Sequence, residues 1–283
     1  MKKLLLITSA LVAAGPAFAA DLPLKAPPMA LPVPAIWSGC HVGGHIGAGT
    51  DSVSYSDPGT AVPPGGLFPT GTVAQNFAPA GASFAANGQP AFLGGVQAGC
   101  DYQFDNHWVI GIGGDFSWTN LSSLANDPFF GGKNGNPMTL STRTDEIATI
   151  TGRVGYAFDN VMIYGKGGAA FAHDSYAVNN SAAVNQALLG CTTPTFTFIG
   201  CNLVGSADRW GWTAGVGVEW AFDKNWSAMV EFDHYGFDAK TVSMSVVNNN
   251  FFVTPANLTV KHDIDTVKIG INYRFWSPVA SRY

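Results

Sequence analysis

The chain has 283 residues, of which 47% are hydrophobic and only 12% are charged, and its formal net charge is -5 at pH 7. A mildly acidic chain without a basic patch is poorly suited to nucleic acid, so nucleic-acid partners are excluded. No run of about 18 apolar residues follows Ala20, which excludes an inner-membrane protein built from transmembrane helices.

The N-terminus has the layout of a secretory signal peptide. Lys2 and Lys3 precede an apolar run from Leu4 to Ala14, and small residues follow over 17–20. The apolar run is shorter than the ~20 residues that a membrane-crossing helix needs. We therefore predict a signal peptide over residues 1–20 and export of the remaining chain.

Five prolines and almost no charge characterise the segment that follows, from Leu22 to Ile36. This composition favours an extended, polyproline-like arm rather than a packed element. We predict a proline-rich periplasmic arm over residues 21–36, and we rank an inert spacer above a specific contact with the cell wall.

A strand-end pattern then recurs four times. Segments of alternating polarity end in an aromatic residue, any residue and a phenylalanine, at Phe104, Phe158, Phe222 and Phe275. After each of the first three, a short Asp/Asn-containing turn leads directly into another alternating run, which is a hairpin signal. The four copies are too far apart for one hairpin each, so every interval must hold two strands and a long connection.

Eight strands result when a first strand from Trp37 to Thr50 is added. The runs that follow the three turns cover Trp108 to Trp118, Val161 to His173 and Trp226 to Phe237, and the long connections cover roughly 51–91, 119–139, 174–207 and 238–260. Short turns at one end and long loops at the other are typical of outer-membrane barrels. We predict an all-β fold, an eight-stranded antiparallel up-and-down transmembrane β-barrel over residues 37–275, with short periplasmic turns, four long external loops and a tail over 276–283.

Charged residues separate by parity along these strands. Positions that share the parity of the repeated phenylalanines are almost wholly apolar, with aromatic residues near the turns, as expected for lipid-facing side chains and an interfacial girdle. The opposite parity should point inward, where each buried charge needs a partner. The predicted interior polar network comprises Asp101, Asp115, Arg153, Lys166, Glu219, Glu231, Asp233, Lys268 and Arg274, with Gln97, Gln103 and Asn272 beside them.

Three further expectations follow from the same parity. Arg274 should pair with Asp101 or Glu219 inside the barrel. Asp265 and Glu146 have outward parity but lie ten or more residues from the repeated phenylalanines, so they are expected at the outer interface. A soluble β-sandwich, the alternative, explains neither the aromatic girdle nor the apolar outward band, and we rank it lower.

The chain resembles the small outer-membrane β-barrel proteins of alphaproteobacteria, which are related in fold to the OmpA-type transmembrane domain and to opacity-type surface proteins. The resemblance rests on residues 20–23, the proline-rich arm, the first strand over 37–44 and the last strand over 267–275. It implies a surface protein of the cell outer membrane that contributes to envelope integrity and contacts lipopolysaccharide, with no catalytic residues. Two departures are Cys40, where the family usually has an aromatic residue, and the tail after Phe275; we take the segment ending at Phe275 as the signal for the barrel-assembly machinery.

The four cysteines allow three pairings in an oxidising compartment. Cys40 and Cys100 share outward parity near the turn ends of the first two strands, and Cys191 and Cys201 fall together in the third long loop. Both pairs are candidate disulfides, and the alternative for each is a pair of free, buried thiols. A metal site is disfavoured because neither pair has zinc-finger spacing.

Three functions remain, in decreasing order of support. The first is a non-enzymatic barrel that contributes to envelope integrity and surface interactions, because an eight-strand lumen is just wide enough for side chains to fill. The second is a narrow porin-like channel for small hydrophilic solutes, since inward glycines such as Gly43, Gly111 and Gly215 could leave space. The third is a lipid A-modifying enzyme, suggested only by His173-Asp174-Ser175, which we interpret as solvated loop-edge residues.

The remaining predictions concern partners. Outer-membrane lipid and lipopolysaccharide are expected around the barrel, and the cell wall or a host surface are further candidates. No cofactor is predicted. His41 and His45 lie about 13 Å apart on a strand, too far for one metal, and are expected to form hydrogen bonds inside the lumen.

Overall fold

The computed structural model describes residues 36–56, 83–126, 139–179, 202–246 and 256–276. The chain divides into two compact units, Met1–Pro32 and Val33–Tyr283. The predicted signal peptide, the arm over 21–35 and the tail from 277 lie outside the described residues. Across the described residues, no helix is long and apolar enough to cross a membrane.

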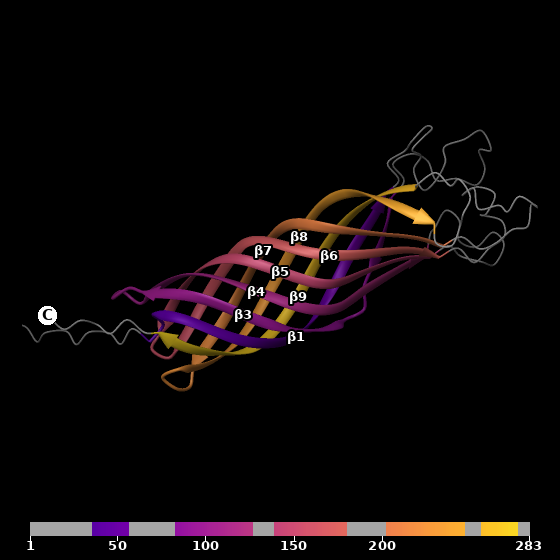
Figure 1. Ribbon diagram of the computed structural model, residues 1–283. Helices are drawn as coiled ribbons and strands as arrows, with labels where there is room; N and C mark the ends of the chain where they lie inside the picture. The colour runs from indigo at the N-terminus through magenta and orange to yellow at the C-terminus, as the bar shows by residue number, and fades with distance from the viewer. Residues whose placement is uncertain (1–35, 57–82, 127–138, 180–201, 247–255, 277–283) are drawn as a thin grey trace, which may run out of the picture. The chain divides into compact units, whose positions relative to one another are not determined.

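The second unit is built from antiparallel strands joined by tight turns at one end (Figure 1). Their bounds are β1 Gly39–Ser56, β2 Ser83–Asn87, β3 Ala91–Gln103, β4 Trp108–Asn126, β5 Thr139–Phe158, β6 Val161–Asn179, β7 Asn202–Ala221, β8 Trp226–Val246 and β9 Ala256–Trp276.

The strands close into a ring of eight. Consecutive strands pair from β3 to β9, and β1 pairs with β3 on one side and β9 on the other, so the sheet has no free edge at its ends. The short β2 pairs with residues 52–56 of β1 beyond the point where the pairing with β3 stops. β2 and β3 therefore act as one barrel strand, interrupted at Gly88-Gln89-Pro90, and the predicted eight-stranded up-and-down barrel is confirmed.

Tight turns connect the strands at the end of the barrel that we call the turn end. The amide of His107 donates to the carbonyl of Phe104, and the amide of Phe222 donates to that of Trp226. His107 and Asp159 have positive φ angles of 71° and 53°. Aspartate visits this left-handed region more readily than most residues, which suits the two-residue turn at Asp159-Asn160.

At the opposite, loop end, the strands run further than the sequence predicted. β1 continues to Ser56 instead of ending near Thr50, β4 to Asn126, β6 to Asn179 and β8 to Val246, while β7 and β9 begin at Asn202 and Ala256. The predicted bounds of the four long connections were therefore wrong. The strands are 18 to 21 residues long, apart from β2 and β3, whereas about 9 to 11 residues suffice to cross a membrane.

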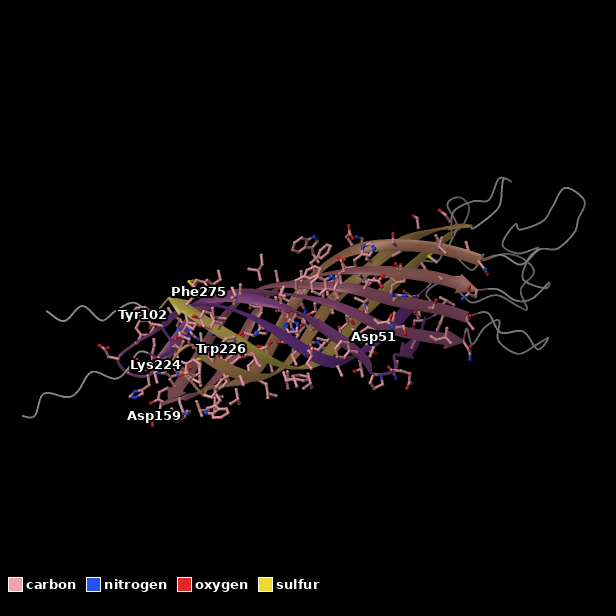
Figure 2. All side chains as sticks on the ribbon, turned by 60° about the horizontal axis from the view of Figure 1, so that its bottom comes forward. Asp51, Tyr102, Asp159, Lys224, Trp226 and Phe275 are labelled. Carbon is pink, nitrogen blue, oxygen red and sulfur yellow. A yellow bond between two sulfur atoms is a disulfide. The ribbon has the colours of Figure 1, made fainter. Side chains whose placement is uncertain are left out.

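Two rings of exposed aromatic side chains mark the ends of an apolar outer surface. At the turn end lie Tyr102, Phe158, Trp226 and Phe275, all at least 43% exposed, and Figure 2 places Tyr102, Trp226 and Phe275 together at that end. The loop-end girdle consists of Phe92, Trp118, Trp210 and Trp212. We call the part between these rings the membrane band, because its outward face carries exposed valine and isoleucine side chains.

Beyond the loop-end girdle, the same barrel wall has the opposite polarity. Here most inward side chains are apolar, and twelve buried residues form one core cluster, including Tyr55, Leu140, Met244, Leu258 and Val260. The outward positions on these stretches are mostly serine, threonine, asparagine and charged residues. We call this part the extension; it is a continuation of the barrel whose wall has the polarity of a water-soluble protein.

The filled interior as the candidate functional site

Trp37, which precedes β1, closes the turn end of the barrel from inside. Its side chain is fully buried. Its amide donates to Gln103 Oε1 at 3.0 Å, and its indole Nε1 donates to the carbonyl of Asp159 at 3.2 Å. The Arg274 guanidinium donates to the Trp37 carbonyl at 2.8 Å and lies 5.6 Å from the centre of its ring. The residue is therefore held by the end of β3, the β5–β6 turn and the end of β9.

A first layer of charges lies directly above Trp37. The Asp101 carboxylate accepts hydrogen bonds from both Arg153 and Arg274, the latter at 3.1 Å. His41 Nδ1 is 3.3 Å from the same carboxylate. Glu219 lies 3.1 Å from Arg153 and 3.9 Å from Arg274. All five side chains are at most 12% exposed where they pair. The structure thus brings Arg274 to Asp101 at hydrogen-bonding distance and to Glu219 at the edge of ion-pair distance.

A second layer follows, built around two lysines. Lys268 Nζ is 2.9 Å from Asp115 and 2.9 Å from Asp233. Lys166 Nζ is 2.5 Å from Glu231, 3.0 Å from Asp233 and 3.7 Å from Asp115. The five groups come from four strands. Removing one member of a buried cluster of this kind strongly destabilises the fold, because the partner charges are then left unpaired in a poorly solvated interior.

Further hydrogen-bonding side chains on β1, β3, β4 and β9 connect to the first layer through Glu219. His45 contacts Gln97 at 2.9 Å and Ser117 at 2.8 Å through its two ring nitrogens, and Gln97 donates to Asn272 at 2.6 Å. Asn272 in turn donates to Glu219 at 3.0 Å. His45 therefore forms hydrogen bonds with side chains of β3 and β4, whereas His41 contacts Asp101 at ion-pair distance.

Glycines on the inward face provide the room that these side chains occupy. A Cβ atom at Gly43 would overlap the side chain of Asn272, one at Gly111 would overlap Asp101, and one at Gly215 would overlap Asp233. The space that the inward glycines leave is therefore taken by polar side chains of the adjacent strand rather than by an open path.

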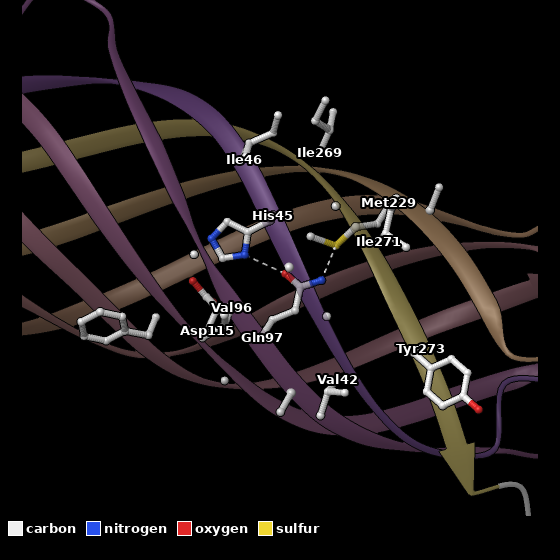
Figure 3. A pocket seen from close by; sticks show the side chains of 18 of the residues that line it. Val42, His45, Ile46, Val96, Gln97, Asp115, Met229, Ile269, Ile271 and Tyr273 are labelled. Carbon is white, nitrogen blue, oxygen red and sulfur yellow. Dashed lines mark hydrogen bonds between the residues drawn. The ribbon is translucent and has the colours of Figure 1, made fainter.

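A hollow of about 1370 Å³ adjoins this region along β1, β3, β4, β8 and β9. Outward apolar side chains such as Val42, Ile269 and Tyr273 line it, together with His45 and Gln97 where glycines thin the wall (Figure 3). Its lining combines outward side chains with inward ones such as Asp115 and Met229, so the hollow involves both faces of the glycine-rich wall.

Sequence reasoning missed a third polar cluster, in the extension. His262 lies between two carboxylates, with Nδ1 3.1 Å from Asp174 and Nε2 3.4 Å from Asp51 (labelled in Figure 2). Arg209 is 3.6 Å from Asp174, and its Nη2 also donates to the carbonyl of Asp238 at 3.0 Å. Four strands thus meet at side chains that are at most 1% exposed.

Apolar layers enclose this cluster on both sides. The cluster that includes Tyr55 and Leu258 lies on one side, and a smaller one that includes Leu121, Tyr235 and Ile264 lies on the other. The two carboxylates raise the pKa of His262 to about 9 despite its burial, and hydrogen bonds from His262 and Thr144 hold the pKa of Asp174 below its usual value. With His262 protonated, two positive charges face two negative ones.

Several predicted positions need separate comment. Cys40 and Cys100 form a disulfide that joins β1 to β3, whereas Cys191 and Cys201 lie outside the described residues. The reading of His173-Asp174-Ser175 as solvated loop-edge residues was wrong for Asp174, which is buried inside strand β6 because its parity points inward. His173 faces outward and is 2.7 Å from Asp208.

The outer-interface acids lie as their parity implied. Asp265 is 50% exposed and pairs with His234 at 2.7 Å, and Glu146 stands opposite Trp118 of the girdle. Within the described ranges, no three His, Cys, Asp or Glu side chains are grouped so as to hold a metal ion.

Known proteins include a family that matches this chain. Residues 17–275 match the family model described as the outer membrane protein beta-barrel domain. The 31 kDa outer-membrane immunogenic protein of Brucella melitensis is 28% identical, covering 97% of this chain and all of that protein, and the 25 kDa outer-membrane immunogenic protein of Brucella canis is 25% identical, with 97% and 99% covered. Among solved structures, the outer membrane protein OprG from Pseudomonas aeruginosa is 13% identical, covers 85% of this chain and 97% of its own, and has a TM-score of 0.41.

Proposed function

The chain belongs to the outer membrane protein β-barrel family, and from that premise we propose that it is a closed, non-enzymatic barrel that contributes to envelope integrity and surface interactions. The observation that carries this proposal is the filled lumen. From Trp37 to the apolar core of the extension, successive layers of paired charges and packed apolar side chains cross the interior.

A lumen closed by side chains is consistent with the small size of the barrel. Eight strands enclose an interior just wide enough for side chains to fill, so little extra volume is available for a solute path. Charged side chains of the interior form ion pairs with one another, as Lys166 does with Glu231 and Asp233. A water-filled channel would instead present such groups to solvent.

The porin-like alternative is less well supported for the same reason. It relied on space beside inward glycines, and those positions adjoin Asn272, Asp101 and Asp233. The enzymatic alternative relied on His173-Asp174-Ser175, which the strand divides between its two faces, with Asp174 buried and His173 paired on the outside.

Orientation and partners belong to the same proposal. Both ends of the eight-strand ring lie at the turn end, so we assign the turn end to the periplasm and the loop end to the exterior. The barrel-assembly machinery would read the last strand, β9, which ends in the girdle residue Phe275 before Trp276 and pairs with β1 to close the ring. Lipopolysaccharide would surround the loop-end girdle and the extension.

Liposome swelling tests closure with neutral solutes. Liposomes that contain the purified, folded protein should swell in isotonic arabinose or glycine no faster than protein-free liposomes, whereas liposomes with a general porin swell rapidly. Swelling that rises with the amount of folded protein would overturn the proposal in favour of the channel.

A further inference from the structure

The Cys40–Cys100 disulfide lies on the lipid-facing side of the barrel wall. The two cysteines stand directly opposite each other in the register of β1 and β3. Cys100 shares its face of β3 with Tyr102, which is 54% exposed, and it stands opposite Ile112 of β4, which is 65% exposed. Cys40 shares its face of β1 with Val42, another exposed apolar residue. Both side chains therefore lie on the outer surface of the barrel rather than in its interior.

The depth of the bond places it within the membrane band. Tyr102 belongs to the turn-end girdle and is labelled in Figure 2, and Cys100 precedes it by two residues on the side that leads into the band. Two residues of a strand measure about 7 Å. Because exposed apolar side chains neighbour the bond on both strands, its sulfur atoms face acyl chains in the inserted barrel, not water.

A pair of cysteines at this position is poorly reactive once the barrel is inserted. The reactive form of a cysteine in disulfide exchange is the thiolate. A thiolate is charged, and moving a charge from water to hydrocarbon is unfavourable unless the charge is paired. Within the described part of the membrane band, no Lys, Arg or His lies on the outward face of β1, β3, β4 or β9. Lipid also separates the two sulfur atoms from oxidants dissolved in water.

Before insertion the same cysteines are in water, where both can react with an oxidant that carries a disulfide. The thiolate of one cysteine attacks the oxidant, forms a mixed disulfide and releases one thiolate of the oxidant. The thiolate of the other cysteine then attacks the first cysteine's sulfur, so that the Cys40–Cys100 bond forms and the second oxidant thiolate leaves. Two electrons pass from the chain to the oxidant, and the two protons lost by the cysteines balance the two that the oxidant thiolates take up.

The bond also fixes how β1 and β3 pair. Cys40 and Cys100 are 60 residues apart in the chain, so they meet only when these two segments come together. A covalent bond between directly opposed residues sets the register of the whole β1–β3 pairing. A slip of one residue would exchange the lipid-facing and inward side chains of one strand. Oxidation in water would therefore select this register before either strand meets lipid.

We propose that Cys40 and Cys100 are oxidised by a disulfide-bearing thiol oxidant of the periplasm before the barrel inserts, and that β1 and β3 enter the membrane as a bonded pair. Barrel assembly then consumes an oxidised chain. This inference goes beyond the proposed function and does not depend on whether the lumen is closed, which liposome swelling tests separately.

The test reverses the order of the two steps. Ser52 and Asn87 provide a matched control site, because they face each other on the same barrel strands and are exposed in the extension, outside the membrane band. The test protein carries Cys191→Ser and Cys201→Ser, and the control protein carries these two changes with Cys40→Ser, Cys100→Ser, Ser52→Cys and Asn87→Cys. Each protein is folded into phosphatidylcholine vesicles either after oxidation or in its reduced form. Oxidised glutathione is then added to the reduced samples, and the thiols that remain are counted by alkylation and intact-protein mass spectrometry.

We expect both bonds to form when oxidation comes first. After folding, the control pair should be oxidised at least about tenfold faster than Cys40 and Cys100, because lipid disfavours their thiolates. A charged, water-soluble phosphine added to the folded, oxidised proteins should reduce the control bond and leave the Cys40–Cys100 bond intact. If the reduced test protein does not fold while the reduced control protein does, the bond is needed before insertion, which supports the same order. Equal rates of oxidation, or of reduction, for the two bonds in the folded barrels would overturn the proposal.

Discussion

The membrane band and the extension are one continuous wall with two opposite patterns of polarity. In the band, Val230, Ile269 and their neighbours face outward while Lys268 and Glu231 face inward. In the extension, Leu258 and Val260 face inward while Lys261 is exposed. The side chains alternate throughout, as strand geometry requires, so the difference lies in the medium that each face meets. The level at which the polarity inverts marks the outer boundary of the membrane.

Strand pairing differs between the two regions as well. Through the band, every neighbouring pair of strands is in continuous register apart from a shift between Cys40 and His41. In the extension, the pairing of β7 with β8 lapses between Val204 and Gly211, and Arg209 spans this interval with its bond to the Asp238 carbonyl. Lipid cannot satisfy backbone groups, whereas water and polar side chains can. An incomplete ladder is therefore tolerated above the membrane and not within it.

The largest expected effect comes from breaking a charge layer of the band. Lys268→Ala leaves Asp115 and Asp233 with one cation fewer in the interior, and loss of one partner of a buried ion pair costs about 3 to 5 kcal/mol. On gels of unboiled samples, the folded protein should be lost at a markedly lower urea concentration than in the wild type. Lys261→Ala, on the outward face of the same strand in the extension, is the control and should change stability by less than about 0.5 kcal/mol.

A lysine scan of outward positions sharpens the boundary between the two regions. Ile269→Lys places a charge against lipid in the middle of the band and should destabilise the barrel by about 2 to 4 kcal/mol. Ser206→Lys, on the outward face of the extension, should be close to neutral. Guanidine titrations in lipid vesicles measure both. Similar losses at both positions would mean that the membrane reaches past the loop-end girdle.

A smaller, pH-dependent effect is expected in the extension. His262 has a folded pKa of about 9, above the ordinary 6.5, so its stabilisation is complete below about pH 6.5 and is lost as the pH rises through 9. At about 1.4 kcal/mol per pKa unit, the loss reaches a few kcal/mol at most. The groups that face it are Asp51, Asp174 and Arg209, with the Tyr176 hydroxyl donating to Asp174.

Hydrogen exchange at graded pH, corrected for the intrinsic rate, should show the extension opening between pH 7 and 10 while the band stays protected. His262→Gln should remove this dependence and leave the extension equally open at every pH. An extension that is as well protected at pH 10 as at pH 6 would contradict the account of the Asp51–His262–Asp174 cluster.

The sequence predicted the band well because Phe104, Phe158, Phe222 and Phe275 fix both the depth and the parity of the strands. The parity of the band does not continue along every strand of the extension, where the sequence had predicted loops. Near Thr144 on β5 and Phe237 on β8 the register shifts, and each bulge exchanges the inward and outward residues beyond it. If the parity of the membrane band is assumed beyond these bulges, inward residues are assigned to the outward face and outward residues to the inward face.

The extension was also hidden by its composition. Many of its outward positions are serine, asparagine and threonine, which are typical of loops, while the inward apolar residues that indicate a strand, such as Val53 and Tyr55, are few on each strand. The His262 cluster could not be predicted because its members lie on four strands, and only their register brings them together. The available signal was weak: apolar residues such as Leu258 and Val260 stand at inward positions, which is the reverse of the pattern in the membrane band.

The central claim is that paired side chains close the lumen, and single-channel recording tests it most directly. The purified protein is inserted into planar bilayers, with insertion verified by a fluorescent label, and the current is followed in concentrated potassium chloride. We predict a trace that stays at the baseline of the bilayer for the wild type. Discrete steps that recur at one size, and whose size scales with salt concentration, would contradict a closed barrel and establish the channel.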